Sequence, residues 1–153
     1  NPEISQQSNF SPNIQPMQLK GLILHCGIYD LQAFVQKAPD EIKMVEWGVY
    51  NLVQAYTGDQ KDDVEFLKQI SPIQHISNAY PPVFISGGNK DFLTDTQSLP
   101  FVETLKARNI AVTEVFYPES KAWLIHEYQF FMGKKESQQT FIRTLDFLHQ
   151  HSL

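Results

Sequence analysis

The chain has little cysteine, little positive charge and no long apolar run. Its single cysteine, Cys26, cannot form an internal disulfide, so we expect a reducing compartment and a cytoplasmic protein. No apolar run is long enough to span a bilayer, and no signal-peptide pattern is present. The 12 Lys and Arg residues do not cluster and are outnumbered by 17 Asp and Glu. Nucleic acid is not expected as a partner, because phosphate binding needs a concentrated basic face.

A nucleophile in a sharp strand-to-helix turn is also missing. None of the ten serines lies in a Gly-x-Ser-x-Gly pattern, which exposes a reactive hydroxyl at such a turn. Ser86 comes closest, since two glycines follow it, but no glycine precedes it at the required position. Cys26 has no such turn either, and we interpret it as a buried small side chain. The chain begins with Asn1 rather than methionine, so we expect it to be part of a longer protein.

Apolar patterns predict three strands and several helices. Short continuous apolar runs, typical of strands buried on both faces, occur at residues 19–26, 83–86 and 111–117. Helical spacing predicts helices at 40–57, at about 62–70, after position 94 or 95, and at 136–149. The expected helix caps are Asp40, Asp62 or Asp63, and Thr94 or Asp95. Residues 1–18 are expected to be a loop or arm.

Strands alternate with helices along the chain, which favours an α/β fold with a mostly parallel sheet and helical crossovers. Three strands are few for such a sheet, which usually has more members. We therefore expect residues 1–153 to be a single partial domain whose sheet continues outside this chain. The strand at 19–26 would then have an open edge, and we expect the chain to self-associate through it.

The segment 81–95 is the most informative part of the sequence. It predicts a buried strand that ends at Gly87 and Gly88 and places Asp91 just beyond the strand end. After one further helix and strand comes His126. A histidine is a suitable general base because its pKa lies near neutrality, and a buried carboxylate can orient it. The pattern therefore predicts two members of a nucleophile–base–acid relay.

Taken together, these segments resemble the C-terminal half of an α/β-hydrolase, in the esterase and lipase branch related to hormone-sensitive lipase. The resemblance is carried by residues 22–31, 81–87, 91–95, 115–118 and His126. It implies a three-layer α/β-hydrolase fold in which residues 32–79 form a cap-like helical insertion. It also implies a serine hydrolase that acts on a small acyl or ester substrate without cofactor or metal. Asp91 would be its acid and His126 its base, although Glu127 stands where a glycine often follows this histidine.

Several alternatives remain open at this stage. The acid could instead be Asp95 or Asp30, which also lie near strand ends. The remaining histidines are interpreted as packed or solvated, and their spacing does not suggest a metal site; they are His25, His75, His149 and His151. Because the nucleophile is missing, we expect this chain alone to be inactive. The alternatives to an esterase are a peptidase or thioesterase of the same fold, and a non-catalytic interaction module or hydrolase-like protein without a nucleophile.

Overall fold

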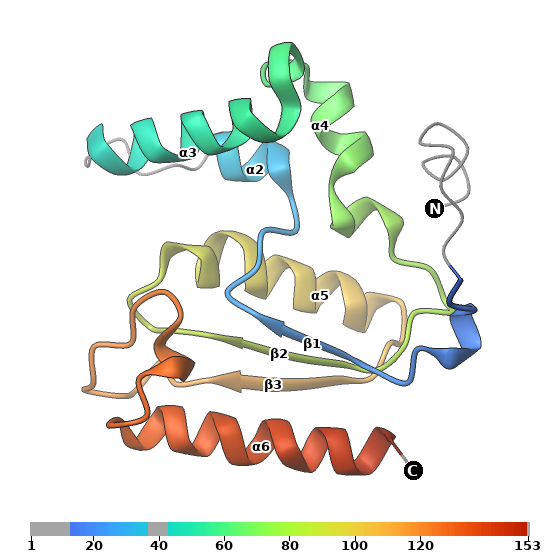
Figure 1. Cartoon of the computed structure of the whole chain (residues 1–153), viewed down its shortest axis with the longest axis vertical. Coiled ribbons are helices and arrows are strands. Elements are labelled where there is room, and N and C mark those ends of the chain that lie inside the picture. The colour runs from blue at the N-terminus through green and yellow to red at the C-terminus, as the bar shows by residue number, and fades with distance from the viewer. Residues whose placement is uncertain (1–12, 37–42, 153) are drawn as a thin grey trace.

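A three-stranded parallel sheet forms the centre of the molecule (Figure 1). The computed structural model describes residues 13–36 and 43–152. Strands β1 (Leu22–His25), β2 (Val83–Gly87) and β3 (Val112–Phe116) lie in the order β1-β2-β3. In the register of the sheet, Ile85 of β2 lies between Leu24 of β1 and Glu114 of β3. The predicted α/β class is therefore confirmed, although β1 is shorter than the predicted run at 19–26.

Strand β2 is buried on both faces because a helix covers each side of the sheet (Figure 1). Helix α5 (Leu99–Ala107) lies on one face and helix α6 (Lys135–His151) on the other. Successive side chains of a strand point to opposite faces. Ile85 accordingly packs in the cluster that contains Phe101 of α5, whereas Phe84 packs with Phe147 of α6. A strand with two covered faces reads as a continuous apolar run, which is why the sequence revealed it.

Three further helices lie on the same side of the sheet as α5 and farther from it (Figure 1). They are α2 (Leu31–Gln36), α3 (Lys43–Thr57) and α4 (Val64–Ile70). They share an apolar cluster whose buried members are Leu31, Phe34, Val53, Leu67 and Leu93. Short 3-10 turns complete the secondary structure, at Pro16–Gln18, Gly58–Gln60, Pro72–His75 and Tyr128–Phe130.

The ends of the helices agree with the sequence in some places and not in others. Asp63 caps α4, since its carboxylate accepts hydrogen bonds from the backbone N–H groups of Glu65 and Phe66. Gly58 follows the last residue of α3 in a left-handed conformation, with φ of 61°, as expected for a helix stop. The proposed cap at Asp40 lies outside the described residues. Helix α2 was not predicted.

The helix after β2 differs most from the prediction. It starts directly after Asp91, and its residues Thr94–Ser98 form a π-helical segment, η4. Neither Thr94 nor Asp95 makes a side-chain cap bond at this helix, so that prediction was wrong. The buried residues of η4 and α5 are Thr94, Gln97, Ser98, Phe101, Val102 and Leu105, whereas Leu99, expected to point inward, is exposed. Among the described residues, no helix combines the length and apolar character needed to cross a membrane.

Candidate active site

The turn after β2 and the loop after β3 are held against each other by hydrogen bonds of the backbone and of the Asn89 side chain. Lys90 N–H donates to the carbonyl of Leu124 at 2.9 Å, and Leu124 N–H donates to Asn89 Oδ1 at 3.2 Å. Gly88 makes this approach possible, because a Cβ at that position would lie 2.1 Å from the Leu124 carbonyl oxygen. The glycine signal in the sequence thus marks a close contact between two loops. This contact brings the loop that carries His126 to the end of β2.

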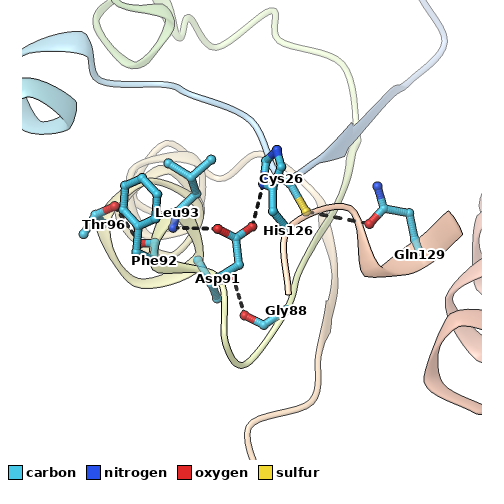
Figure 2. Close-up of polar contacts among 9 residues, drawn as sticks. Cys26, Gly88, Asp91, Phe92, Leu93, Thr96, His126 and Gln129 are labelled. Carbon is cyan, nitrogen blue, oxygen red and sulfur yellow. Dashed lines mark hydrogen bonds and ion pairs between the residues drawn. The ribbon is translucent and has the colours of Figure 1, made fainter. Parts of the chain in front are cut away.

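The Asp91 carboxylate is buried, with the residue only 6% exposed, and both of its oxygens have partners (Figure 2). Oδ1 accepts the backbone N–H of Leu93 at 3.0 Å, which caps the helix that follows. Oδ2 lies 2.9 Å from Nδ1 of His126. Asp91 therefore caps a helix and pairs with a histidine at the same time, since each oxygen serves one purpose.

His126 presents its other ring nitrogen away from this contact. An ionised carboxylate can only accept a hydrogen bond, so Nδ1 carries the proton and donates it to Asp91. In a neutral imidazole with this tautomer, Nε2 carries no proton and can accept one from another group. The side chain is 52% exposed, which leaves it accessible. The next residue, Glu127, is left-handed with φ of 59° and ψ of 25°, and this sharp change of direction follows the histidine directly.

Cys26 lies beside this pair, at the end of β1. Its backbone φ is 48°, and its thiol donates to Oε1 of Gln129 at 3.7 Å (Figure 2). Burial raises the pKa of the thiol to about 11, so the group stays protonated near neutral pH. This agrees with the interpretation of Cys26 as a buried small side chain. Its closeness to the pair could not be read from the sequence, because the two residues are far apart along the chain.

The alternative acids and histidines lie in other surroundings. Asp30 caps α2 through the backbone N–H of Ala33, and Asp95 is exposed. Nδ1 of His25 lies 2.7 Å from Oγ of Ser86 between neighbouring strands, and burial lowers the pKa of His25. His151 packs on Phe147 at the end of α6. Asp91 and His126 are paired in the manner of an oriented base.

An apolar cavity of about 500 Å³ adjoins His126. Its lining combines the end of β1, helices α2 and α3, and the start of the helix after β2, and consists of Cys26, Ile28, Phe34, Gly48, Leu52, Phe92, Leu93 and His126. A neighbouring cavity of about 450 Å³ shares Ile28 and Leu52 with it. Carbon-rich walls next to an oriented imidazole suit an uncharged, apolar group.

One supporting residue was missed entirely. The side chain of Gln97, in η4, is buried, and its Oε1 accepts the backbone N–H groups of Tyr29 and Asp30 at 3.0 and 2.8 Å. These bonds fix the segment between β1 and α2 against the helix after β2, and this segment borders the cavity. A glutamine in a helical stretch is usually exposed, so nothing in the sequence pointed to this role.

No protein-family model matches this sequence, and no curated protein is detectably similar to it. Solved structures do resemble it. Esterase B from Lactobacillus rhamnosis is 19% identical with a TM-score of 0.68, covering 99% of this chain and 46% of the esterase. Its C6-C4 SN3 inhibited form is 17% identical with a TM-score of 0.70, covering 99% of this chain and 47% of the esterase. A Staphylococcus aureus protein assigned as an esterase is 19% identical with a TM-score of 0.55, covering 91% of this chain and 45% of that protein.

These comparisons establish the fold. At such low identities the likeness shows a shared three-dimensional arrangement and nothing finer. The chain spans slightly less than half the length of the esterases that it matches. It has an α/β-hydrolase type of fold, as these esterases do, and the fold expected from the sequence is confirmed.

Proposed function

We propose that this chain is the C-terminal part of a serine hydrolase of the esterase type, with Asp91 as the acid and His126 as the base of its triad. The observation that carries the proposal is the 2.9 Å contact between the two side chains. Support also comes from the place of that contact, at the carboxyl ends of β2 and β3, on a fold shared with esterases.

In the proposed reaction, the hydroxyl of a serine outside this chain attacks the ester carbonyl. His126 accepts the hydroxyl proton at Nε2 and then donates it to the departing alcohol, which leaves an acyl-enzyme. Water, activated in the same way, hydrolyses the acyl-enzyme and restores the serine. Asp91 holds the imidazole in the required tautomer and stabilises its protonated form, while remaining ionised itself.

Helices α2, α3 and α4 would then be a cap over the substrate, as expected for the insertion at residues 32–79. The apolar cavity of about 500 Å³ lies between helices α2 and α3 and His126, which favours an uncharged acyl or alcohol group as its occupant. A small carboxylic ester meets that requirement. Coverage of 46–47% of the esterase chains supports a nucleophile supplied from residues outside this sequence.

The chain alone is expected to be inactive. Removing the serine from such a triad costs on the order of a million-fold in turnover, because the remaining residues act as a unit with it. The test therefore uses the full-length gene product and p-nitrophenyl esters, with peptides as the competing substrate class. A Gly-x-Ser-x-Gly pattern upstream of this sequence is expected there.

Two substitutions in the full-length protein test the assignment. His126→Gln and Asp91→Asn should each lower kcat by about 10³-fold or more. Both side chains are needed for the transfer of the serine hydroxyl proton to the imidazole. His149→Gln is the matched control, because His149 is exposed on α6 and far along the chain from the pair. Unchanged turnover in His126→Gln would reject the proposed base.

A second candidate is a non-catalytic interaction module, which the exposed apolar side chains of α6 favour. These side chains are Phe141, Ile142, Leu145 and Leu148. Together with the open edge of β1, they also lead us to infer that two copies of this chain associate. Light scattering at high micromolar concentration measures this, and a monomer there would contradict it. Absence of both the upstream motif and esterase activity in the full-length protein would favour the interaction module.

A further inference from the structure

Three metal-ligating side chains from separate parts of the chain converge at one point. The ligand atoms of Cys26, Asp91 and His126 all lie within 4.8 Å of one another. Cys26 comes from the end of β1, Asp91 from the turn after β2, and His126 from the loop after β3. Two of the three residues, Cys26 and Asp91, are only 6% exposed. The relay proposed above uses Asp91 and His126 and gives the thiol no role.

We propose that Cys26, Asp91 and His126 form a binding site for one Zn²⁺ ion. The donor atoms select the metal: a thiolate and an imidazole suit zinc, whereas Mg²⁺ and Ca²⁺ require mostly oxygen ligands. Three protein ligands leave one position of a tetrahedral zinc for water or another small ligand. The exposed side of His126 provides the route of entry.

The donors lie close enough together to converge on a tetrahedral ion after their side chains move slightly. With usual zinc bond lengths, a nitrogen and an oxygen ligand lie roughly 3.3 Å apart, and a sulfur lies roughly 3.6 Å from either. The Nδ1 to Oδ2 distance is 2.9 Å, so the pair would separate by a few tenths of an ångström as the metal replaces the shared proton. The distances from the sulfur to the other two donors are at most 4.8 Å, so each would have to shorten by at most about 1.2 Å.

Neighbouring groups already hold the donors in place. Oδ1 of Asp91 is fixed by the Leu93 N–H, which leaves Oδ2 for the metal. The buried amide of Gln129 contacts Cys26 Sγ, and its NH₂ can donate to a thiolate after a rotation of the amide. Such outer contacts orient ligands and raise metal affinity.

Binding must displace the thiol proton. Burial raises the pKa of Cys26 to about 11, and the carboxylates of Asp91 and Glu127 oppose a nearby thiolate. A divalent cation cancels that repulsion, so uptake should release a proton and strengthen as pH rises. Three other titratable groups lie near the thiol and interact with it electrostatically. They are His126, Tyr29 and Tyr128.

The experiment uses the purified chain, freed of metal, and does not depend on the proposed hydrolase activity. Zn²⁺ is titrated against a chromophoric chelator, and one equivalent is expected to bind. Co²⁺ then serves as a spectroscopic probe, because a cobalt–thiolate bond gives an intense near-ultraviolet absorption band. Loss of a partner that only orients a ligand costs about 10–100-fold in affinity, so Cys26→Ser, Asp91→Asn and His126→Gln should each weaken Zn²⁺ binding at least about 100-fold.

His149→Gln is the control and should bind Zn²⁺ as the unmodified chain does. The proposal is overturned if Cys26→Ser keeps the original affinity, or if His149→Gln loses it. Should the buried substitutions unfold the chain, as circular dichroism would reveal, the cobalt spectrum of the unmodified protein decides alone. A stoichiometric cobalt–thiolate band supports the site, and its absence rejects it. Ester hydrolysis by the full-length protein in the presence of a chelator tests the triad separately.

Discussion

The two helices that cover the sheet are attached to it in different ways. Helix α5 faces the sheet with Phe101, Val102 and Leu105, which are at most 1% exposed. Helix α6 contributes one large apolar side chain, Phe147, and its other buried residues are Ser137 and Thr140. Its remaining large apolar residues, Phe141, Ile142, Leu145 and Leu148, are 45–57% exposed. The apolar residues of a helix therefore do not by themselves identify the face that packs on its own sheet.

The polar residues of α6 connect it to the loop that carries His126. Oγ1 of Thr140 lies 2.9 Å from the hydroxyl of Tyr128, and Oγ of Ser137 donates to the Tyr128 carbonyl at 2.7 Å. Tyr128 is fully buried and lies two residues after His126. Helix α5 thus supplies core, whereas α6 supports the candidate site and keeps an apolar surface available.

The sharpest test of this contrast is a pair of matched truncations. Phe101→Ala should lower the free energy of unfolding by about 3–5 kcal/mol, because it removes a buried ring that stacks on Tyr29. Phe141→Ala should change it by no more than about 0.5 kcal/mol, since the ring is half exposed. Urea denaturation measures both values. Similar losses in the two variants would mean that α6 packs as α5 does.

A smaller effect is expected from the polar attachment of α6. Thr140→Val should cost about 1–3 kcal/mol, because it leaves the buried hydroxyl of Tyr128 without its Thr140 partner. Thr144→Val is the matched control on the same helix, since Oγ1 of Thr144 bonds only the backbone carbonyl of Thr140 in the hydrogen bonds described. Thermal unfolding of the two variants compares them. Equal shifts in Tm would remove the special role of Thr140.

Self-association should respond to the exposed apolar surface of α6. The double substitution Phe141→Ser and Ile142→Ser should weaken association at least about tenfold, since burial of each side chain is worth about 1.5–3 kcal/mol. Leu99→Ser, on the exposed part of α5, should leave association unchanged. Sedimentation equilibrium gives the dissociation constants. An equal response to Leu99→Ser would point to a different surface.

The smallest effect concerns pH. The hydrogen bond from Ser120 lowers the pKa of Glu136, in the first turn of α6. A carboxyl whose pKa is lower in the folded state stabilises the fold above its ordinary pKa, and that contribution is lost as pH falls through the folded value. Tm should therefore fall slightly more steeply below pH 4.5 in the original chain than in Glu136→Gln. Parallel curves would contradict this role of Glu136.

Much of the fold could be predicted because the signals were local. Strand β2 has both faces covered, so its residues form one apolar run, and Asp63 precedes a helix as an ordinary cap. The Gly87-Gly88 turn and the order of Asp91 and His126 likewise lie on the chain itself. The expected catalytic roles of Asp91 and His126 remain predictions, although their side chains are in contact.

The features that escaped prediction depend on contacts between distant segments. The π-helical segment η4 places Gln97 inward, against the residues that follow β1. No local sequence pattern predicts this position of the side chain. The position of Cys26 beside His126 requires three strand ends to meet at one edge of the sheet. The exposed stripe of α6 follows the regular helical spacing of a buried one, so spacing could not distinguish the two.

The backbone at Glu127 has a consequence for protein engineering. A left-handed conformation is costly for β-branched residues and free of strain for glycine. In a library randomised at position 127 and sorted for folded clones, glycine, asparagine and aspartate should be enriched, while valine, isoleucine and threonine should disappear. A glycine at the equivalent position of a related sequence would then be explained by the backbone conformation of this turn. It would not by itself indicate a contact with substrate.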